Sequence, residues 1–428
     1  MNILIVGSGA REHAIARALS NSPQKPTLYC CALTNNPGIE PLCKEYWIGN
    51  ISDADEIPNL AKDWKIDLAI IGPEAPLEKG IADALWAINI PVVGPKKKLA
   101  NLETSKSFTR DLLAYYQIPG SPQYRVFYNL VGVKDFLQEL GEGGYVIKAD
   151  GLMGGKGVKV AGDHLHSFEE AYEFCEELHA DNQAFVIEEK LIGQEFSFMC
   201  FCDGEHLIPM PLVQDHKRAF ENDKGPNTGG MGSYSDATHS LPFLSKEDIK
   251  AAQQINLAVI EALKKECDER YIGILYGSFI ATRAGIKLIE YNARFGDPES
   301  LNVLSILESD FVEVCKAMVS NNLSRAQVQF APLATVCKYA VPKGYPDQPE
   351  DGALIDVSGV QYPERLFFAA VNEKDGKIYT TRSRAVAVVG VAKTISEAEE
   401  IAEQEINRIK GALYHRKDIG REVCLSCD

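Results

Sequence analysis

The sequence of 428 residues lacks any run of about 18 apolar residues, so we expect no membrane-spanning helix. It also lacks a signal-peptide pattern, because the apolar stretch at residues 2–6 is short and is typical of a β-strand. Basic residues are in the minority, with 44 Lys and Arg against 60 Asp and Glu, and the formal net charge is −16. A strongly acidic surface repels nucleic acid and anionic membranes, so we expect neither as a partner.

The 11 cysteines are odd in number, and their scatter gives no disulfide framework. Free thiols in a large chain are typical of the cytoplasm, where we expect this protein. Cys424 and Cys427 have the spacing of half a zinc site, but no second Cys or His pair matches it, so we expect no zinc there. Internal repeats and low-complexity segments are absent, and the length exceeds one ordinary core, which predicts two to four domains.

Residues 1–102 alternate apolar runs with helical patterns. The runs cover residues 2–7, 27–33, 67–72 and 91–94, and the helical patterns cover residues 11–19 and about 80–88. Continuous apolar strands between helices predict a parallel sheet that is covered on both faces. The first domain is therefore expected to be a Rossmann-like α/β domain.

The remaining chain predicts two further parts. A helix over 105–116 precedes strands at 145–150, 184–191 and 195–204 and a helix at 167–178, which predicts a small β-rich lobe at about 120–192 within a domain of residues 103–328. A helix from about residue 256 then precedes two strands, 274–282 and 286–292, joined by a turn. Strands at 333–341, 365–371 and 384–392 and a helix at 396–409 predict a β-rich domain over 329–428.

The first glycine-rich turn, residues 7–12, follows a strand and opens a helix. Such a turn lets the backbone approach an anion at the helix N terminus. A dinucleotide fingerprint would place Gly where Glu12 stands, and an acidic residue where the second strand ends at Thr34. A nicotinamide site is therefore disfavoured. A tight structural turn and a phosphate site for a monophosphate substrate both remain, and we favour the second.

The second glycine-rich loop, residues 150–158, follows a strand that contains Lys148. Its four glycines suit a backbone that folds over phosphate, and Lys148 and Lys156 supply positive charge. It differs from a P-loop because no Ser or Thr follows Lys156 and because it enters a strand. Alone, the loop could equally be a flexible hairpin tip.

The strand at 286–292 favours the phosphate site. Glu290 and Asn292 are two residues apart, so both side chains point to one face of the strand. Carboxylate and amide oxygens are ligands that Mg²⁺ accepts together with phosphate oxygens. Arg294 follows on the same face and could bind a phosphoryl oxygen. The alternative is a solvated strand end, but the apolar start of the strand places it in a core.

The segments 214–218 and 225–232 lie between these elements. The first carries charges of both signs, and the second is too rich in Gly and Pro to be regular structure. A solvated loop is one interpretation. Asn227, Thr228 and free backbone amides could equally hold a small carboxylate.

These features together resemble the ATP-grasp fold, with a cover loop, a strand lysine, a nucleotide-edge strand at 186–191 and a Glu-x-Asn metal strand. Within that fold, the sequence resembles the phosphoribosylamine–glycine ligases of purine biosynthesis. The matching runs follow family order from residue 1 to about 423: GSGAREHAIA, IGPEAPLEKGIAD, LETSKSFTRDLL, VIKADGLMGGKGV, VIEEKLIGQEFSF, QDHKRAFENDKGPNTGGMGSYS, IEYNARFGDPE and HRKDIGREV. Other ATP-grasp enzymes share only the nucleotide parts.

The resemblance implies a Rossmann-like N-terminal domain, ATP-grasp central domains and a small β-rich C-terminal domain. It implies an ATP-dependent ligase, using Mg²⁺ or Mn²⁺, that joins glycine to 5-phosphoribosylamine through glycyl phosphate. The partners are then small molecules, and a monomer is expected.

The resemblance also implies roles for individual residues. The ATP-binding set is Lys106, Lys148, Gly154, Gly155, Lys156, Gly157, Glu188, Lys190, Leu191 and Glu195. The metal ligands are Glu290 and Asn292. The substrate set is Gly9, Gly72, Pro73, Glu74, Asp215, Pro226, Asn227, Thr228, Gly229, Gly230 and Arg294. The expected catalytic residues are Lys148, Asp215 and Arg294.

Four segments depart from the family pattern: residues 35–38, Leu301, 368–371 and 380–382. They fall mostly on the substrate side, so an ATP-grasp ligase with another acid or amine remains an alternative. A nicotinamide-dependent dehydrogenase and a catalytically silent nucleotide-binding protein are more remote. The complete set of Lys148, Glu290 and Asn292 argues against the silent protein.

Overall fold

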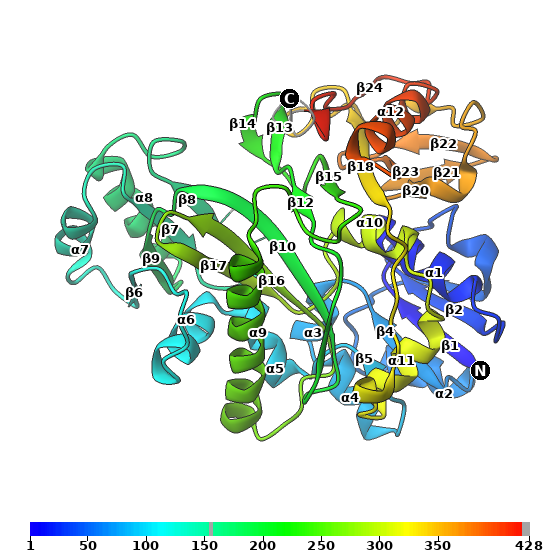
Figure 1. Ribbon diagram of the computed structural model, residues 1–428, viewed down its shortest axis with the longest axis horizontal. Coiled ribbons are helices and arrows are strands. Elements are labelled where there is room, and N and C mark those ends of the chain that lie inside the picture. The colour runs from blue at the N-terminus through cyan, green and yellow to red at the C-terminus, as the bar shows by residue number, and fades with distance from the viewer. Residues whose placement is uncertain (154–156, 422–428) are drawn as a thin grey trace.

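The computed structural model describes residues 1–153 and 157–421. The predicted loop residues Gly154, Gly155 and Lys156, and the cysteines Cys424 and Cys427, lie outside the described residues. Figure 1 shows a small lobe on one side of a central sheet, with the two terminal regions stacked on the other side. Within the described ranges, no helix is long and apolar enough to cross a membrane.

The N-terminal region is a parallel sheet, as predicted, and its strand order is β3-β2-β1-β4-β5. Its strands are β1 (Asn2–Val6), β2 (Thr27–Ala32), β3 (Cys43–Ile48), β4 (Leu68–Ile71) and β5 (Val92–Val93), and its helices are α1 (Ala10–Ser20), α2 (Glu56–Asp63), α3 (Glu74–Glu78) and α4 (Ile81–Ala87). Leu4 and Val6 pack into one core while Ile3 and Ile5 pack into another, so β1 is buried on both faces. The sequence did not predict the edge strand β3, because its polar residues interrupt the apolar pattern.

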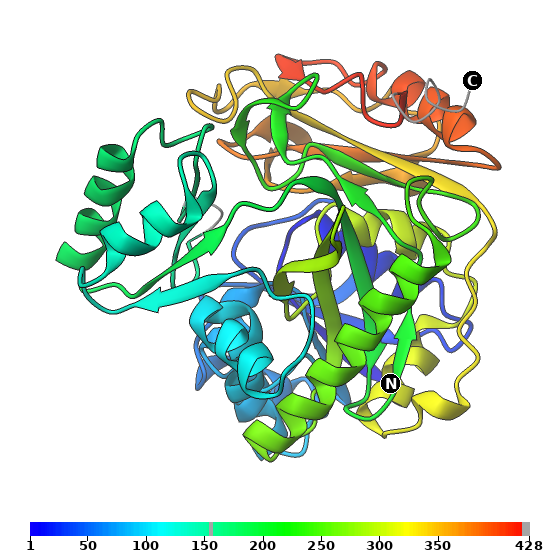
Figure 2. The same cartoon turned by 60° about the vertical axis from the view of Figure 1, so that its left-hand side comes forward.

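The small lobe is an antiparallel sheet in the order β6-β9-β7-β8. Its elements are β6 (Tyr124–Phe127), α7 (Val133–Leu140), β7 (Tyr145–Ala149), β8 (Val158–Val160), α8 (Phe168–Ala180) and β9 (Phe185–Glu189). Phe127, Phe136 and Phe185 are part of a core that this lobe does not share with the rest of the chain. Figure 2 shows the lobe projecting away from the other regions, which is the arrangement a moving cover needs.

The central sheet has the order β11-β10-β16-β17 and is antiparallel. Its strands are β10 (Gly193–Cys202), β11 (Leu207–Pro209), β16 (Gly273–Thr282) and β17 (Gly285–Asn292). The neighbouring helices are α5 (Lys97–Thr104), α6 (Lys106–Tyr115), α9 (Lys246–Cys267), α10 (Glu299–Ser305) and α11 (Phe311–Val319). Helix α9 begins about ten residues before its predicted start, and Ser245 and Asp248 form its capping box.

The C-terminal region is built on a sheet in the order β12-β15-β18-β23-β20, with β24 paired to β18. Its strands are β12 (Gln214–Asp215), β15 (Gly232–Ser235), β18 (Ala334–Pro342), β20 (Leu366–Phe368), β23 (Val386–Ala392) and β24 (Leu413–Tyr414), covered by α12 (Ile395–Ile406). A smaller sheet contains β19 (Leu354–Ile355), β21 (Val371–Lys374) and β22 (Lys377–Thr380). Strands β12 and β15 precede residue 329 in the sequence but belong to this sheet, so the segment near residue 215, which is predicted to contact substrate, is joined to the C-terminal region.

Candidate active site

A cavity of about 1330 Å³ lies where the small lobe, the central sheet and the two terminal regions meet. It brings together most of the residues predicted from the sequence. The predicted residues that line it are Glu74, Lys106, Lys148, Gly157, Glu188, Lys190, Leu191, Glu195, Asp215, Asn227, Thr228, Gly229, Glu290, Asn292 and Arg294. Gly9, Gly72, Pro73, Pro226 and Gly230 do not line it.

A buried ion-pair triad lies at the small-lobe end of the cavity. Lys148 Nζ is 2.7 Å from Glu188 Oε2, and Arg110 donates to the same carboxylate through Nε at 2.6 Å and Nη2 at 3.0 Å. Burial raises the pKa of Glu188, but Arg110 and Lys148 lower it to about 2. The ionised Glu188 carboxylate therefore holds the two cations, in addition to lying on the predicted adenine-edge strand.

Arg110 was not predicted from the sequence. It lies on α6, on the buried helical face that also carries Leu113, and its side chain is 2% exposed. A charged residue three positions before a buried Leu, on the same face of an amphipathic helix, is the signal that could have identified it.

A β-bulge in β17 connects this triad to Glu290 and Asn292, the predicted metal ligands. Ser278 pairs with Glu290 and Phe279 pairs with Leu288, so Ile289 is the extra residue. The Ile289 carbonyl accepts hydrogen bonds from Arg110 Nη2 at 2.7 Å and Lys148 Nζ at 3.1 Å. Beyond the bulge, Glu290 and Asn292 line the cavity as predicted, and the intervening Tyr291, although its side chain is buried, also contributes to the lining.

The second glycine-rich loop, called the cover loop below, begins at Asp150, and this residue binds the start of α6. Asp150 Oδ1 accepts from the Lys106 backbone N–H at 2.6 Å, and Asp150 also accepts from Ser105 and Ser107. Carboxylates are favourable at helix N termini because the orphan N–H groups and the helix dipole point there. Lys106 Nζ donates to the Gly151 carbonyl at 2.8 Å, and burial lowers the pKa of Lys106. The backbone N–H and the side-chain ammonium of Lys106 therefore both bind the cover loop.

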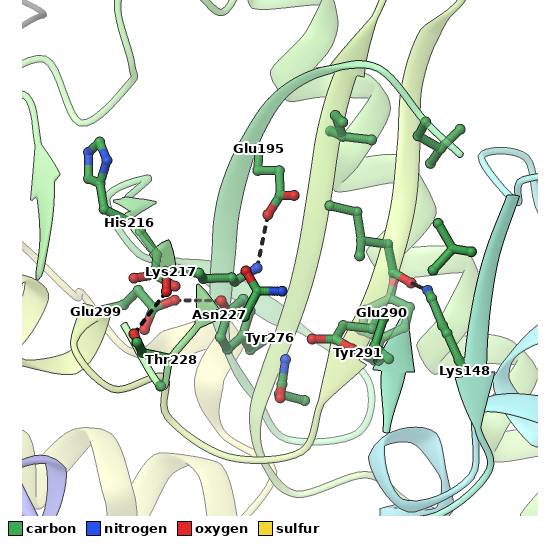
Figure 3. Close-up of a pocket in the computed structure, with 18 of the residues that line it drawn as sticks. Lys148, Glu195, His216, Lys217, Asn227, Thr228, Tyr276, Glu290, Tyr291 and Glu299 are labelled. Carbon is green, nitrogen blue, oxygen red and sulfur yellow. Dashed lines mark hydrogen bonds and ion pairs between the residues drawn. The ribbon is translucent and has the colours of Figure 1, made fainter. Parts of the chain in front are cut away.

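The other end of the cavity contains a second set of charges (Figure 3). Lys217 Nζ is 2.9 Å from Glu195 Oε2, and this lysine lowers the pKa of Glu195. Asp215 Oδ1 is buried and, among the described residues, has no hydrogen-bond partner. Burial and the charge of Glu299 raise the pKa of Asp215 well above its usual range. An unpartnered carboxylate oxygen in a cavity is an acceptor available to a ligand.

Glu299 is a further site residue that sequence reasoning missed. It is 2% exposed, accepts hydrogen bonds from Ser197 at 2.8 Å and from Tyr276, and lines the cavity beside Asp215. Its position in the RFGDPE run was noted only as part of the family resemblance.

The prediction that residues 225–232 form no regular structure is wrong, because β14 (Lys224–Asn227) covers the first three of them, and their predicted free amides are only partly free. Thr228 N donates to the Lys217 carbonyl at 2.8 Å, and Gly230 N donates to Thr228 Oγ1 at 3.1 Å. These two amides are used inside the loop because Thr228 folds back on Lys217. They hold the loop together and are not available to a substrate carboxylate.

Arg294 lies between two carboxylates, so it is not an unpaired cation beside the end of the strand. Its Nη2 is 3.0 Å from Glu103 Oε1 and its Nε is 3.3 Å from Glu74 Oε2. Burial raises the pKa of Glu74, but Arg294 lowers it to about 2. Arg294 therefore joins the N-terminal region to the metal strand at the cavity wall.

The N terminus of α1 is occupied by a side chain of the helix itself. The Gly9 N–H, predicted to face a phosphate, donates to Glu12 Oε2 at 2.6 Å. A Cβ at Gly72 would lie 2.0 Å from Glu12 Oε1, so that glycine makes room for the same carboxylate. Arg11 and Glu74 line the cavity in place of Gly9, Gly72 and Pro73.

The four segments that depart from the family pattern make packing contacts and hydrogen bonds within this chain. Leu301 is fully buried, Phe368 donates its N–H to His13 Nδ1 at 3.0 Å, and Asn36 donates to the Phe368 carbonyl at 2.9 Å. Thr381 donates to the Ala370 carbonyl. Within the described residues, none of the four departing segments lines the cavity.

Comparison with known proteins gives the family. Models described as the N domain, the ATP-grasp (A) domain and the C domain of phosphoribosylglycinamide synthetase match residues 1–103, 104–300 and 335–422. The chain belongs to the phosphoribosylglycinamide synthetase family. This confirms the resemblance, the fold class and the assignment to ATP-dependent ligases, and it leaves the nicotinamide-dehydrogenase alternative without support.

Members of the phosphoribosylglycinamide synthetase family match along the whole chain. The phosphoribosylamine–glycine ligase of Methanosarcina barkeri is 47% identical over 420 residues, covering 98% of this chain and 96% of its own. That of Methanocaldococcus jannaschii is 48% identical over 431 residues, covering 99% and 97%. The solved phosphoribosylamine–glycine ligase of Thermotoga maritima has a TM-score of 0.83 at 28% identity, covering 98% of this chain and 100% of its own.

The fold extends beyond this family. The biotin carboxylase domain of Hydrogenobacter thermophilus 2-oxoglutarate carboxylase has a TM-score of 0.72 at 16% identity, covering 97% of this chain and 91% of its own.

Proposed function

We propose that this chain joins glycine to 5-phosphoribosylamine in an amide bond and cleaves ATP to ADP and phosphate, through glycyl phosphate, as a step of purine biosynthesis. The observation that carries the proposal is one cavity with two chemically different ends. The small-lobe end holds Lys148 and Glu290, and the opposite end holds Asp215, whose Oδ1 has no hydrogen-bond partner among the described residues. Family membership and the full-length relatives support the same substrates.

ATP occupies the small-lobe end in this proposal. Lys148 and Lys106 contact the phosphates, the loop up to Gly157 covers them, Lys190 and Leu191 lie at the adenine edge, and Glu195 faces the ribose. Lys106 and Lys148 approach from different elements, α6 and β7, so moving the lobe changes the distance between them. A lobe with its own core can close as a unit and exclude water.

Glu290 and Asn292 would hold Mg²⁺ or Mn²⁺. Carboxylate and amide oxygens are suitable ligands for such an ion. Both residues line the cavity together with Lys106 and Lys148, the lysines that contact phosphate in this proposal. Among the described residues, no cluster of three or more His, Cys, Asp or Glu residues could hold a metal, so the ion needs phosphate oxygens as further ligands. When bound, it would neutralise charge on the transferred phosphoryl group.

Asp215 and Glu299 are positioned to receive the ammonium group of glycine. Two neighbouring buried carboxylates, one with an unpartnered oxygen, favour a cation between them. Keeping the ammonium protonated also prevents it from acting as a nucleophile. The bound glycine then cannot supply the attacking nitrogen, which comes from the amine of phosphoribosylamine.

The reaction has two displacements. A glycine carboxylate oxygen attacks the γ-phosphorus, the bond to the β,γ-bridging oxygen breaks, and ADP leaves. The neutral amine of phosphoribosylamine then attacks the acyl carbon, phosphate leaves with the former carboxylate oxygen, and a proton is lost from nitrogen. Lys148 and Arg294 stabilise negative charge on the transferred group, and most of the remaining acceleration comes from positioning.

Oxygen-18 labelling tests this sequence. Glycine labelled in both carboxylate oxygens should transfer one labelled oxygen to phosphate for each amide formed, because the attacking oxygen leaves with phosphate. Amide formation with unlabelled phosphate would refute the acyl phosphate. Transfer of label from another amino acid, with none from glycine, would retain the mechanism and select the alternative ligase with a different acid.

A further inference from the structure

A two-stranded hairpin forms one wall of the cavity without belonging to any larger sheet. It consists of β13 (Arg218–Phe220) and β14 (Lys224–Asn227), which pair only with each other among the described strands. Its turn contains Asn222 and Asp223, both at positive φ (58° and 50°). An isolated two-stranded hairpin is only marginally stable in water, so contacts from elsewhere must hold it.

The segment 415–421, here called the C-terminal arm, holds this hairpin. Arg416, whose side chain is 1% exposed, donates through Nη1 to the Arg218 carbonyl at 3.0 Å and to Asp223 Oδ1 at 2.8 Å. It also binds Asp418 through Nε at 2.9 Å and Nη2 at 2.6 Å, and Asp418 accepts from the Asn222 N–H at 2.9 Å. One guanidinium thus contacts the first residue and the turn of the hairpin together.

The C-terminal arm is itself fixed to the core of its region. Lys338 on β18 is fully buried and donates to the Lys417 carbonyl at 3.0 Å. The same ammonium pairs with Glu399 at 2.6 Å and Glu403 at 2.7 Å, both on α12. Because a buried lysine with two carboxylates is costly to move, the arm is a rigid support for the hairpin.

On its other side the hairpin contacts the small lobe. Arg218 Nη2 is 2.6 Å from Asp163 Oδ2, in the turn that follows β8, and Arg218 Nη1 donates to the Gly225 carbonyl at 2.9 Å. Strand β8 begins directly after the cover loop. Figure 1 shows β13 and β14 between the C-terminal strands and the small lobe. The Arg218–Asp163 pair is therefore a direct link between the hairpin and the small lobe.

The hairpin also ends in the site. Lys217, which precedes the hairpin, and Asn227, its last residue, line the cavity, and Lys217 pairs with Glu195. Any movement of the hairpin would displace Lys217 relative to Glu195 and the Asp215 end of the cavity.

We propose that the hairpin at 218–227 is a latch, that the Arg218–Asp163 pair holds the small lobe closed, and that Arg416 is the positioning residue that fixes the latch. This rests on the proposed function, because the latch protects the acyl phosphate from water. Loosening it lets water compete with the amine. ATP cleavage then exceeds amide formation.

The ratio of phosphate released to amide formed tests the latch. Removing a partly exposed ion pair should increase the open lobe population about two- to fivefold, so R218A and D163A should raise hydrolysis without amide formation by that factor. The double exchange R218D with D163R should return the ratio toward wild type. An exchange of Arg125 and Glu139, a 3.8 Å pair exposed on the same lobe, is the matched control and should leave the ratio unchanged. An unchanged ratio in both single variants would overturn the latch.

The positioning role of Arg416 is tested with quantities that a purely structural role would not change. R416A should raise the KM for glycine about tenfold and raise the phosphate-to-amide ratio. R416K should restore part of both, because lysine keeps the positive charge but lacks the forked donor groups of the guanidinium. A lower unfolding midpoint with both quantities unchanged would make Arg416 only structural.

Hydrogen exchange of residues 157–165 distinguishes failure of the latch from failure of the proposed function. A non-hydrolysable ATP analogue with Mg²⁺ should protect this segment in wild type and less in D163A, with no glycine present. Equal protection in both proteins would refute the latch, whatever the ligase substrates are.

Discussion

Replacing Arg110 with Met tests whether the buried triad serves ATP binding or stability alone. Arg110 is 2% exposed and binds both oxygens of Glu188 and the Ile289 carbonyl. Methionine retains much of the volume but none of these bonds. Lys148 is then the remaining partner of the Glu188 carboxylate in the triad.

The magnitude follows from this rearrangement. Removing one partner of a buried ion pair costs about 3–5 kcal/mol, and we expect about 3 kcal/mol in the free energy of unfolding because Lys148 still pairs with Glu188. A Lys148 ammonium held more tightly by Glu188 is less available to phosphate. The loss of one charge-assisted contact, about 1.5 kcal/mol, predicts roughly tenfold weaker ATP binding.

The pH dependence has a defined sign. The pKa of Glu188, about 2 when folded, is below the usual carboxyl value of about 4.3. The stabilisation from Glu188 is therefore present above about pH 4.3 and is lost as the pH falls toward 2. In R110M the folded pKa rises, so acid unfolding should begin at a higher pH.

Urea unfolding at several pH values and calorimetric titration with an ATP analogue measure both effects. The double variant R110M with E188Q is the control, because removing both charges should recover part of the stability and, by releasing Lys148 from the carboxylate, part of the ATP affinity. If R110M unfolds more easily but binds ATP and Mg²⁺ as wild type does, the link from the triad to the phosphates is wrong.

Three further predictions concern single site residues. E290A should abolish amide formation at ordinary Mg²⁺ concentration and leave the urea midpoint nearly unchanged; wild-type turnover would remove Glu290 from the metal site. K148A should raise the Kd for ATP about tenfold and the KM for glycine much less, and equal changes in both would place Lys148 elsewhere. D215N should raise the KM for glycine about tenfold with little change for ATP, as steady-state kinetics with each substrate varied would show; an unchanged KM for glycine would refute the ammonium contact.

The parts of the fold that the sequence predicted well are those with continuous apolar strands. Strand β1 is buried on both faces from Ile3 to Val6, and only Asn2 at its start is polar, so the apolar run is uninterrupted. Strand β3 was missed because it is an edge strand with exposed Lys44 and Glu45. The first turns of α9 were missed for a similar reason, although Ser245 and Asp248 mark the N terminus.

The parts of the site that local sequence could predict are those within one element. Glu290 and Asn292 follow from strand alternation alone. Arg110 and Glu188 are 78 residues apart, and Ser197 and Glu299 are 102 apart, so only the tertiary structure pairs them. The prediction of a phosphate at Gly9 came from the glycine turn alone, and the sequence did not indicate that Glu12, in place of a fingerprint glycine, caps its own helix.

The paired charges of the cavity give a reason for the metal ion that we propose at Glu290 and Asn292. The cations Lys106, Arg110, Lys148, Lys217 and Arg294 all line it, together with the carboxylates Glu74, Glu103, Glu188, Glu195 and Glu290. Most of these cations already have a carboxylate partner within 3.3 Å, so the protein offers little uncompensated positive charge to a triphosphate. A divalent ion at Glu290 and Asn292 would supply the missing charge where the phosphoryl group is transferred. On this argument the pairing orients the cations before ATP arrives, and the metal provides the attraction, which makes loss of Glu290 more damaging than loss of any one lysine.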